Sequence, residues 1–248
     1  MYQFFIQPDN IKENDILITD SQDVNHIKNV LRMKKGEKLA LCCEETGREY
    51  LCCVAEFEEN GIRAAIEDIN GESRELPVRI TLFQGLPKGD KMELIIQKAV
   101  ELGAAEIVPV ATKRSVVKLD TKKAAKKVQR WNEIAKSAAK QSKRTIIPEV
   151  KPVLSWREAL EYGKTFDMLL FPYEDAEGIS HSREVMASVK GKQSLGIYIG
   201  PEGGFQREEV EQAARVGAQT ITLGHRILRT ETAGMAVLSI LMFMLEED

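Results

Sequence analysis

Two stretches near the carboxyl end of the chain combine glycine with polar residues in a way that could bind a small molecule. Residues 199–205 read Ile-Gly-Pro-Glu-Gly-Gly-Phe, and residues 223–233 read Leu-Gly-His-Arg-Ile-Leu-Arg-Thr-Glu-Thr-Ala. Each follows a short β-like run and leads into a helix-like run. Glycine lets a ligand approach the main chain closely, and open α/β sheets bind ligands in loops at the carboxyl ends of their strands. The two stretches therefore predict one shared small-molecule site.

The spacing of these glycines argues against two common phosphate-binding sites. A P-loop requires a lysine and a hydroxyl residue after its last glycine, and residues 200–205 contain neither. A dinucleotide fold places its glycines on the first strand–helix turn, whereas these come late in the chain. Glu202 would repel a phosphate, so a cationic or neutral polar ligand is favoured. Either loop alone could be a tight turn without a ligand, but two of them favour a site.

The elements that must position these loops change in character near residue 72. Short strands separated by turns predict a compact β-barrel before that point. The strands are expected at residues 3–6, 15–18, 38–43, 50–57 and 61–69, with one short helix at about residues 22–30. Asp20 or Ser21 would cap this helix. Residues 70–75 are typical of a polar linker or turn.

Beyond the linker, strands and helices alternate, which predicts a parallel sheet covered by helices. The strands are expected at residues 78–86, 105–110, 167–171, 195–199 and 220–223. Asp90 would cap the helix after the first strand. That helix would pack on the sheet through the apolar stripe Met92, Ile95, Ile96, Ala99 and Val100. Arg207-Glu208-Glu209 suits the start of another helix, because acidic residues match the helix dipole there.

Four cysteines form two adjacent pairs, Cys42–Cys43 and Cys52–Cys53, on either side of a predicted hairpin turn. A turn centred between Gly47 and Arg48 would place Cys42 opposite Cys53 and Cys43 opposite Cys52. Neighbouring residues in a strand point to opposite faces, so the four sulfurs would not converge on one metal ion. We therefore expect the cysteines to pack as small hydrophobic residues, and we expect no metal.

The formal net charge of −3 conceals a strongly basic segment. Residues 113–144 contain twelve Lys or Arg and only two acidic residues, a local charge of +10 that leaves −13 on the rest of the chain. On a helix, Lys122, Lys126 and Arg130 share one face, with Lys123 and Lys127 beside them. The opposite, buried side would contain Ala124, Ala125, Val128, Trp131, Ala135 and Ala138. This basic face is either simply solvated or contacts a polyanion.

Length and hydropathy describe an ordinary globular chain of one large or two modest domains. The most apolar run, residues 233–245, is shorter than the about 18 residues that suggest a membrane helix, and it reads better as a buried terminal helix. The amino-terminal residues lack the basic and apolar regions of a signal peptide. We therefore expect a cytoplasmic protein without a membrane segment.

A set of further motifs runs through both predicted domains. They are Phe4-Phe5-Ile6, His26 with Val30-Leu31-Arg32-Met33-Lys34 and Gly36, Lys88-Gly89-Asp90-Lys91-Met92-Glu93, Lys113-Arg114-Ser115, Gln141-Ser142-Lys143-Arg144 with Ile147-Pro148, and the two glycine-containing stretches. Together they strongly resemble the RsmE family, which are ribosomal RNA uridine-N3 methyltransferases of the SPOUT superfamily. The sequence departs from that family at Gln3, where arginine is frequent, and at Gln206, where a capping serine or threonine is usual.

The resemblance implies an α/β fold: a SPOUT parallel sheet with a C-terminal trefoil knot in residues 73–248, preceded by a small PUA-like, RNA-binding β-barrel in residues 1–72. It also implies a homodimer, to which the helix at residues 233–245 could contribute if it does not serve only the core. The cofactor would be S-adenosyl-L-methionine, held largely by backbone groups. By position, its contacts would be Leu170, Phe171, Pro172, Ile199, Gly200, Pro201, Glu202, Gly203, Gly204, Leu223, Gly224, Ile227, Leu228, Arg229, Thr230, Thr232 and Ala233.

The implied reaction is methylation of uridine N3 in small-subunit (16S) ribosomal RNA, either naked or in the assembled subunit. Because N3 carries a proton, a guanidinium near O2 or O4 would stabilise the uridinate that forms. Arg229 and Arg114 are the candidates, and Glu231 could accept the proton or orient an arginine. Alternatively, the arginines contact phosphate and Glu231 caps the last helix. The expected RNA contacts are Arg32, Lys113, Arg114, Lys122, Lys126, Arg130, Lys143 and Arg144.

Two other functions fit parts of the sequence. A non-catalytic RNA-binding protein would use the barrel and the basic helix, with structural glycine loops and no affinity for the cofactor. A small-molecule enzyme of the doubly wound class would use the loops and leave the basic helix solvated, with little affinity for RNA. Only a methyltransferase predicts that both ligands bind.

Overall fold

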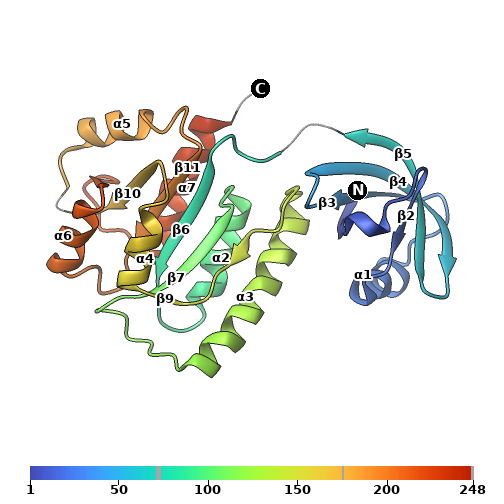
Figure 1. The fold of residues 1–248 in the computed structure, drawn as a ribbon, viewed down its shortest axis with the longest axis horizontal. Coiled ribbons are helices and arrows are strands. Elements are labelled where there is room, and N and C mark those ends of the chain that lie inside the picture. Colours follow the sequence, from blue (N-terminus) through green and yellow to red (C-terminus); the bar gives the residue numbers. More distant parts are fainter. Residues whose placement is uncertain (71–73, 175, 247–248) are drawn as a thin grey trace. The chain divides into compact units, whose positions relative to one another are not determined.

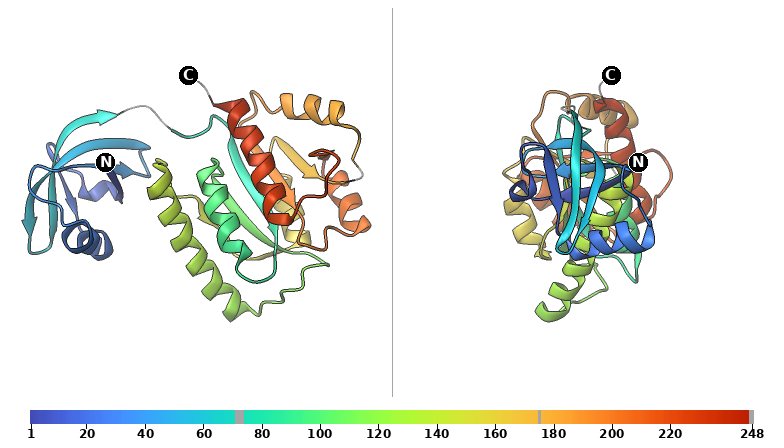
Figure 2. Two further views of the ribbon diagram at one scale, coloured as in Figure 1. Left: turned by 180° about the vertical axis from the view of Figure 1, so that it is seen from behind. Right: turned by 90° about the vertical axis from the view of Figure 1, so that its right-hand side faces the viewer.

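The computed structural model describes residues 1–70, 74–174 and 176–246, and its internal contacts divide the chain into two compact units. Unit 1 comprises Met1–Glu75 and Ala139–Ile147, and unit 2 comprises Leu76–Ala138 and Pro148–Asp248. Figures 1 and 2 show that each unit is built on its own sheet. The grouping of residues 139–147 with unit 1 was not expected from the sequence.

Unit 1 is a five-stranded sheet with short helical turns. Its strands are β1 (Tyr2–Ile6), β2 (Asp15–Ile18), β3 (Lys38–Cys43), β4 (Arg48–Glu58) and β5 (Gly61–Asn70), in the order β1-β3-β4-β5-β2. β1 pairs with β3 in parallel, and the other pairs are antiparallel. The turns are η1 (Pro8–Asn10), α1 (Ser21–Asn25) and the π-helical η2 (His26–Val30). Asp20 caps α1 as predicted, because its carboxylate accepts hydrogen bonds from the Gln22 and Asp23 N–H groups at 2.9 and 3.0 Å.

The hairpin between β3 and β4 corrects the predicted cysteine register. Cys43 lies opposite Arg48, and Cys52 lies opposite Leu39, so the two cysteine pairs do not face each other. The turn occupies residues 44–47 and ends at Gly47, whose φ of 63° is in the left-handed region that favours glycine. Cys43 and Cys52 pack in the apolar core of unit 1, as expected of small hydrophobic residues.

Carboxylates hold the segment 139–147 within unit 1. Glu75 accepts hydrogen bonds from Arg144 Nε at 2.7 Å and from the Thr145 N–H at 2.8 Å. Gln3 Nε2 donates to the Arg144 carbonyl at 2.5 Å. Arg144 is only 5% exposed, so its guanidinium is committed to Glu75 and we do not retain Arg144 as an RNA contact.

We expect Glu75→Gln to lower the free energy of unfolding by about 3 kcal/mol near neutral pH, because it removes the buried carboxylate that pairs with the Arg144 guanidinium. Burial raises the pKa of Glu75, but Arg144 and Thr145 outweigh it and bring the pKa below its ordinary value of 4.5. A carboxyl with a lowered folded-state pKa stabilises the fold above its unfolded pKa, and this contribution is lost as the pH falls through the folded pKa. Urea unfolding of both proteins at neutral and acidic pH should therefore show a difference that shrinks in acid.

Glu161→Gln is the control for this prediction, because its pair with Lys164 is exposed and should contribute little. If the difference in the free energy of unfolding between the Glu75 variant and the unaltered protein stayed constant across the acidic range, the ionised carboxylate would not be its cause.

Unit 2 contains a parallel sheet, which confirms the predicted α/β class. Its strands are β6 (Arg79–Gly85), β7 (Glu106–Ala111), β8 (Glu149–Val150), β9 (Leu154–Ser155), β10 (Met168–Pro172), β11 (Ser194–Ile199) and β12 (Ala218–Ile221). The order is β12-β10-β11-β6-β7-β8, and β9 also pairs with β7. Every ladder is parallel. β12 lies two residues earlier than predicted.

Helices cover both faces of this sheet (Figure 2). They are α2 (Lys91–Glu101), α3 (Thr121–Ser142), α4 (Trp156–Gly163), α5 (Ile179–Ala187), α6 (Arg207–Arg215) and α7 (Thr230–Leu245). α2 and α7 pack against each other, and the predicted apolar stripe of α2 is buried. α4 and α6 enclose an aromatic cluster on the other face that includes Phe83, Trp156, Phe171, Tyr198 and Phe205.

Two local predictions in unit 2 are wrong. Asp90 precedes α2 but its side chain makes no capping hydrogen bond. Ala125 of α3 is exposed, because the apolar side of this helix is fully buried only from Trp131 onward. α6 begins at Arg207 as predicted.

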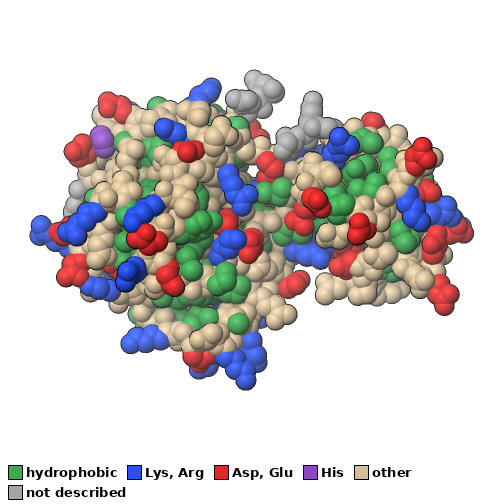
Figure 3. All heavy atoms as spheres, in the orientation of Figure 1, with side chains coloured by type: hydrophobic (Ala, Val, Ile, Leu, Met, Phe, Trp, Pro, Cys, Tyr) green, Lys and Arg blue, Asp and Glu red, His purple; other side chains and the backbone are tan. Residues whose placement is uncertain are grey.

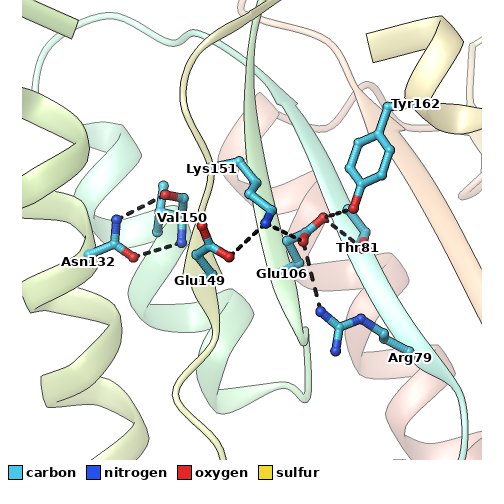
Figure 4. A network of polar contacts seen from close by, with 8 residues as sticks. All are labelled: Arg79, Thr81, Glu106, Asn132, Glu149, Val150, Lys151 and Tyr162. Atoms are coloured by element: carbon cyan, nitrogen blue, oxygen red, sulfur yellow. Dashed lines mark hydrogen bonds and ion pairs between the residues drawn. The ribbon is translucent and has the colours of Figure 1, made fainter. Parts of the chain in front are cut away.

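A polar network fixes the amino end of the unit 2 sheet, the edge opposite the glycine loops (Figure 4). Glu106, at the start of β7, is 2% exposed and accepts a hydrogen bond from the Tyr162 hydroxyl at 2.8 Å. Lys151 Nζ and Arg79 Nη2 lie 3.5 and 3.9 Å from its other oxygen. Asn132 of α3 bonds to the backbone of Val150 on β8. These groups satisfy one another, so the network has a structural role.

Within the described ranges, no helix combines the length and apolar character needed to cross a membrane. The same residues contain no cluster of three or more His, Cys, Asp or Glu side chains that could hold a metal ion.

Candidate functional site

The topology of unit 2 places the two glycine-containing loops at one edge of the sheet. From β6 the chain runs outward to β7 and β8 and then crosses to the other side of β6. There it forms β10 first, then β11 between β10 and β6, and finally β12 on the outer side of β10. The loops after β6, β10, β11 and β12 therefore leave the same carboxyl edge. A change in winding direction of this kind is where open parallel sheets bind ligands.

The loop of residues 200–204, called the glycine loop below, is a tight turn pressed against β6. The Gly204 N–H bonds to the Pro201 carbonyl at 2.9 Å, and Gly204 has a φ of 65°. A Cβ on Gly85 would lie 2.6 Å from Pro201 Cδ, so β6 must end in a residue without a side chain. The glycine loop exposes Glu202 and Gly203 and leaves Gly200 and Gly204 partly accessible.

The start of α7 closes one side of the glycine loop. The Thr230 hydroxyl donates to the Gly200 carbonyl at 2.5 Å, and Gln84 Nε2 donates to the same hydroxyl oxygen at 2.8 Å. Thr230 and Gln84 are both buried. The two predicted loops thus meet through Gly200 and Thr230.

Lys91 joins the glycine loop to α7 from the α2 side. Its Nζ lies 3.1 Å from Glu202 Oε1 and 3.3 Å from Glu231 Oε2. The Lys88 N–H also donates to Glu202 at 3.1 Å. Burial raises the pKa of Glu202, but backbone hydrogen bonds and Lys91 outweigh it and keep the pKa below its ordinary value. The Glu202 carboxylate is therefore bound by groups of the protein itself. The prediction that its charge favours a cationic or neutral ligand did not take these contacts into account.

The turn after β7 closes the opposite side of the glycine loop. Arg114 Nη1 donates to the Gly203 carbonyl at 2.8 Å. The buried Glu209 accepts from the Lys113 N–H at 2.9 Å and from the Gln206 N–H at 2.8 Å. Glu209 was not among the predicted site residues. Its position three residues after Gln206 is the capping-box spacing that could have indicated its role.

The loop after β12 is more open. The Thr222 N–H bonds to Ser182 Oγ at 2.8 Å, and Gly224 has a φ of 113°, which favours glycine. Ile227 is 86% exposed. Arg229 is exposed, and its guanidinium has no hydrogen-bond or ion-pair partner among the described residues.

The predicted cofactor residues differ in how accessible they are in the structure. Leu170 and Phe171 are fully buried, so they could offer only backbone atoms. Several positions are partly or fully accessible around the same edge: Pro172, Gly200, Gly203, Gly204, Leu223, Gly224, Ile227, Leu228, Thr232 and Ala233. The accessible part of this edge therefore combines the backbone of three loop glycines with side chains of residues 223–233.

The predicted RNA contacts differ in whether their side chains form ion pairs. Lys122 and Lys126 are exposed on α3 without a described partner, whereas Arg130 pairs with Glu93 at 2.7 Å. Lysine and arginine side chains gather where α3 begins (Figure 3). Lys113 pairs with Glu208. In unit 1, Arg32 and Lys143 are exposed and have left-handed φ values of 53° and 57°.

Known proteins resemble this chain over nearly its whole length. A model described as an RNA methyltransferase domain matches residues 74–242, and one described as an RNA methyltransferase PUA domain matches residues 18–67. Ribosomal RNA small subunit methyltransferase E of Bacillus subtilis (strain 168) is 39% identical over 251 residues, which cover 99% of this chain and 98% of that protein.

Solved structures agree with these matches. A ribosomal RNA small subunit methyltransferase E from Neisseria gonorrhoeae, bound to S-adenosyl methionine, is 33% identical with a TM-score of 0.83 and covers 98% of this chain and 97% of that chain. A Legionella pneumophila methyltransferase in complex with the same cofactor is 30% identical with a TM-score of 0.81 and covers 97% and 96%.

Proposed function

The chain belongs to the ribosomal RNA small subunit methyltransferase E family, and from this premise we propose that it transfers a methyl group from S-adenosylmethionine to N3 of a uridine in small-subunit (16S) ribosomal RNA. The family resemblance drawn from the motifs is thereby confirmed. The observation that carries the proposal is the meeting of the glycine loop with the start of α7 at the carboxyl edge of a parallel sheet.

The residues at this edge fit S-adenosylmethionine. Gly203 and Gly204 leave their backbone accessible, and a Cβ on Gly203 would come within 3.1 Å of Arg114 Cβ, so the loop cannot carry side chains there without moving. Residues 200–204, 223–224 and 227–233, with the backbone of residues 170–172, would hold the cofactor. When bound, it supplies an electrophilic methyl group. The loops would fix its orientation for in-line transfer.

Arg229 is the residue best suited to stabilise the uridinate. Its guanidinium is exposed and has no partner among the described residues, whereas Arg114 is engaged with the Gly203 carbonyl. A guanidinium that approaches O2 or O4 lowers the energy of the anion that forms when N3 loses its proton. We assign Arg114 and Glu231 to positioning, because each already holds a group of the site.

The finer architecture follows the family. We propose that the carboxyl-terminal part of residues 73–248 is tied in a trefoil knot and that residues 1–72 form an RNA-binding PUA-like domain. The expected location is the cytoplasm, where small ribosomal subunits are assembled. The substrate is this RNA, naked or within the subunit.

We also propose that the protein is a homodimer. Ile240, Phe243 and Met244 of α7 are 43%, 85% and 41% exposed and share one side of the helix, a surface that a second copy would cover. Phe243→Glu should therefore dissociate the dimer to a monomer of 27.9 kDa in sedimentation experiments. If the unaltered protein sediments as a monomer at tens of micromolar, the dimer proposal is wrong.

The function is tested by calorimetric titration with S-adenosylmethionine, with ATP and NAD as controls, followed by methyl transfer to small subunits and to naked RNA. Nucleoside analysis should find 3-methyluridine. Binding without transfer to either substrate would contradict the proposed reaction. If the protein binds RNA but does not bind S-adenosylmethionine, either alone or with RNA present, a non-catalytic RNA-binding function is favoured.

Reversing two lysines tests the basic surface of α3. We expect the double variant Lys122→Glu, Lys126→Glu to weaken RNA binding and to reduce the slope of log K against log salt by about 2, because each lysine displaces about one counterion. Arg183→Glu with Lys190→Glu, exposed on or after α5, is a charge-matched control. An unchanged slope in the α3 variant would mean that this face is only solvated.

A further inference from the structure

Gln84 is a buried amide that has no assigned role in the proposed reaction. It lies at the carboxyl end of β6, opposite Ile199 of β11, and is completely buried. Its Nε2 donates to the Gly85 carbonyl at 3.0 Å and to Thr230 Oγ1 at 2.8 Å. Its Oε1 has no hydrogen-bond partner among the described residues. A buried polar atom without a partner is costly, so the retained amide indicates a purpose beyond packing.

The surrounding groups fix the direction of the Gln84 amide. If it were turned over, Oε1 would face the Gly85 carbonyl oxygen at 3.0 Å, and two acceptors would repel each other. Nε2 must therefore point toward Gly85 and Thr230. Because Thr230 Oγ1 accepts this hydrogen bond, its single proton is directed to the Gly200 carbonyl at 2.5 Å.

We propose that Gln84 and Thr230 are positioning residues that form a one-way hydrogen-bond relay, which fixes the Gly200 carbonyl and so sets the shape of the glycine loop for S-adenosylmethionine. The inference rests on the proposed function and deepens it. The relay joins three elements: the end of β6, the loop after β11 and the first residue of α7. It turns the Gly200 carbonyl toward Thr230, so the cofactor must be bound by the remaining groups of the loop. Within the segment 227–233 that would hold the cofactor, Thr230 therefore acts through Gly200, and its neighbours make the direct contacts.

Removing the donor at the start of the relay tests this role. Gln84→Met replaces the amide with an unbranched side chain of similar size that cannot donate a hydrogen bond, so the Thr230 hydroxyl is no longer held toward Gly200. In calorimetric titration, we expect this variant to raise the dissociation constant for S-adenosylmethionine about tenfold or more. This is the effect expected when a buried hydrogen bond between uncharged groups is lost. Thr230→Val should have a similar effect, whereas Thr230→Ser retains the hydroxyl and should restore binding to within about threefold of the unaltered protein.

A double-variant cycle separates the relay from a general loss of packing. If Gln84 acts only through Thr230, the double variant Gln84→Met, Thr230→Val should bind no more weakly than the weaker single variant, because residues in one network are not additive. Thr165→Val is the matched control, since the Thr165 hydroxyl donates to the Tyr162 carbonyl at 2.8 Å, away from the loops. Affinity should be unchanged in that variant.

Failure of the relay and failure of the proposed function give different results. If the unaltered protein does not bind S-adenosylmethionine, the proposed function fails. If it binds and Gln84→Met binds equally well, the relay is wrong. The relay is also wrong if Thr230→Ser binds as weakly as Thr230→Val, or if the two effects add in the double variant.

Discussion

Gly203→Val is expected to raise the dissociation constant for S-adenosylmethionine by about 100-fold or more, a loss of about 2.8 kcal/mol, because the loop that would hold the cofactor must move. A Cβ at Gly203 would lie 3.1 Å from Arg114 Cβ and 3.5 Å from the Arg114 carbonyl oxygen. The two further methyl groups of valine would force the glycine loop away from the turn after β7. That movement would break the hydrogen bond from Arg114 to the Gly203 carbonyl.

Calorimetric titration measures this effect, and RNA binding at low salt is the companion measurement. RNA affinity should be retained, because the exposed lysines of α3 are outside the glycine loop. Gly178→Val is the matched control: its φ is −55°, and a Cβ there would meet no atom within 4 Å. If Gly203→Val binds the cofactor as well as the control does, the glycine loop does not form the binding site.

The features predicted correctly from the sequence depend on local patterns. β2 and β3 coincide with the predicted ranges because short apolar runs between turns define short strands. The apolar stripe of α2 and the start of α6 follow from helical spacing and from the helix dipole. Once strands and helices alternate, a parallel sheet is the expected arrangement, and the loops that follow its strands must share one edge.

The features that were missed depend on contacts between distant residues. Glu202 reads as a free anion in the sequence, but Lys91 and the Lys88 N–H hold it in the structure from more than a hundred residues away. Arg144 belongs to a basic segment, yet Glu75 and the Gln3 amide bury it in unit 1. Composition gives the charge of a segment and cannot say which charges find partners when the chain folds.

The hairpin register was missed for a different reason. A turn of four residues ending at Gly47 and a turn centred after Gly47 both use the same glycine, and they differ in which turn position has a positive φ. The strands on both sides are apolar enough to accept either register, because the two pairings differ by four positions, an even number that keeps the same residues facing the core. The local sequence therefore leaves both registers open, and the structure has the one in which Gly47 ends the turn.

Arg114 and Arg229, which are equivalent candidates in the sequence, differ in their contacts in the structure. Arg114 donates to the glycine loop, so replacing it should disturb cofactor binding as well as catalysis. Arg229 precedes α7, where its backbone carbonyl accepts from the Ala233 N–H at 2.8 Å, and its side chain is exposed. Of these two arginines, Arg229 is the one whose guanidinium has no partner among the described residues, so substrate could engage it without breaking such a contact.

Arg229→Met is therefore expected to lower kcat by about 10²- to 10³-fold, the usual effect of removing a group that stabilises an anion in the transition state. The affinity for S-adenosylmethionine should change little, and Arg229→Lys should recover part of the rate because it retains a charge without the planar fork. The rate should also require a higher pH in the methionine variant, because the uridinate forms less readily without the cation. Arg226→Met, which removes a neighbouring exposed arginine, is the control. If Arg229→Met instead raises KM for RNA and reduces the salt dependence of binding while kcat is unchanged, Arg229 contacts a phosphate and the stabilising cation must come from another residue.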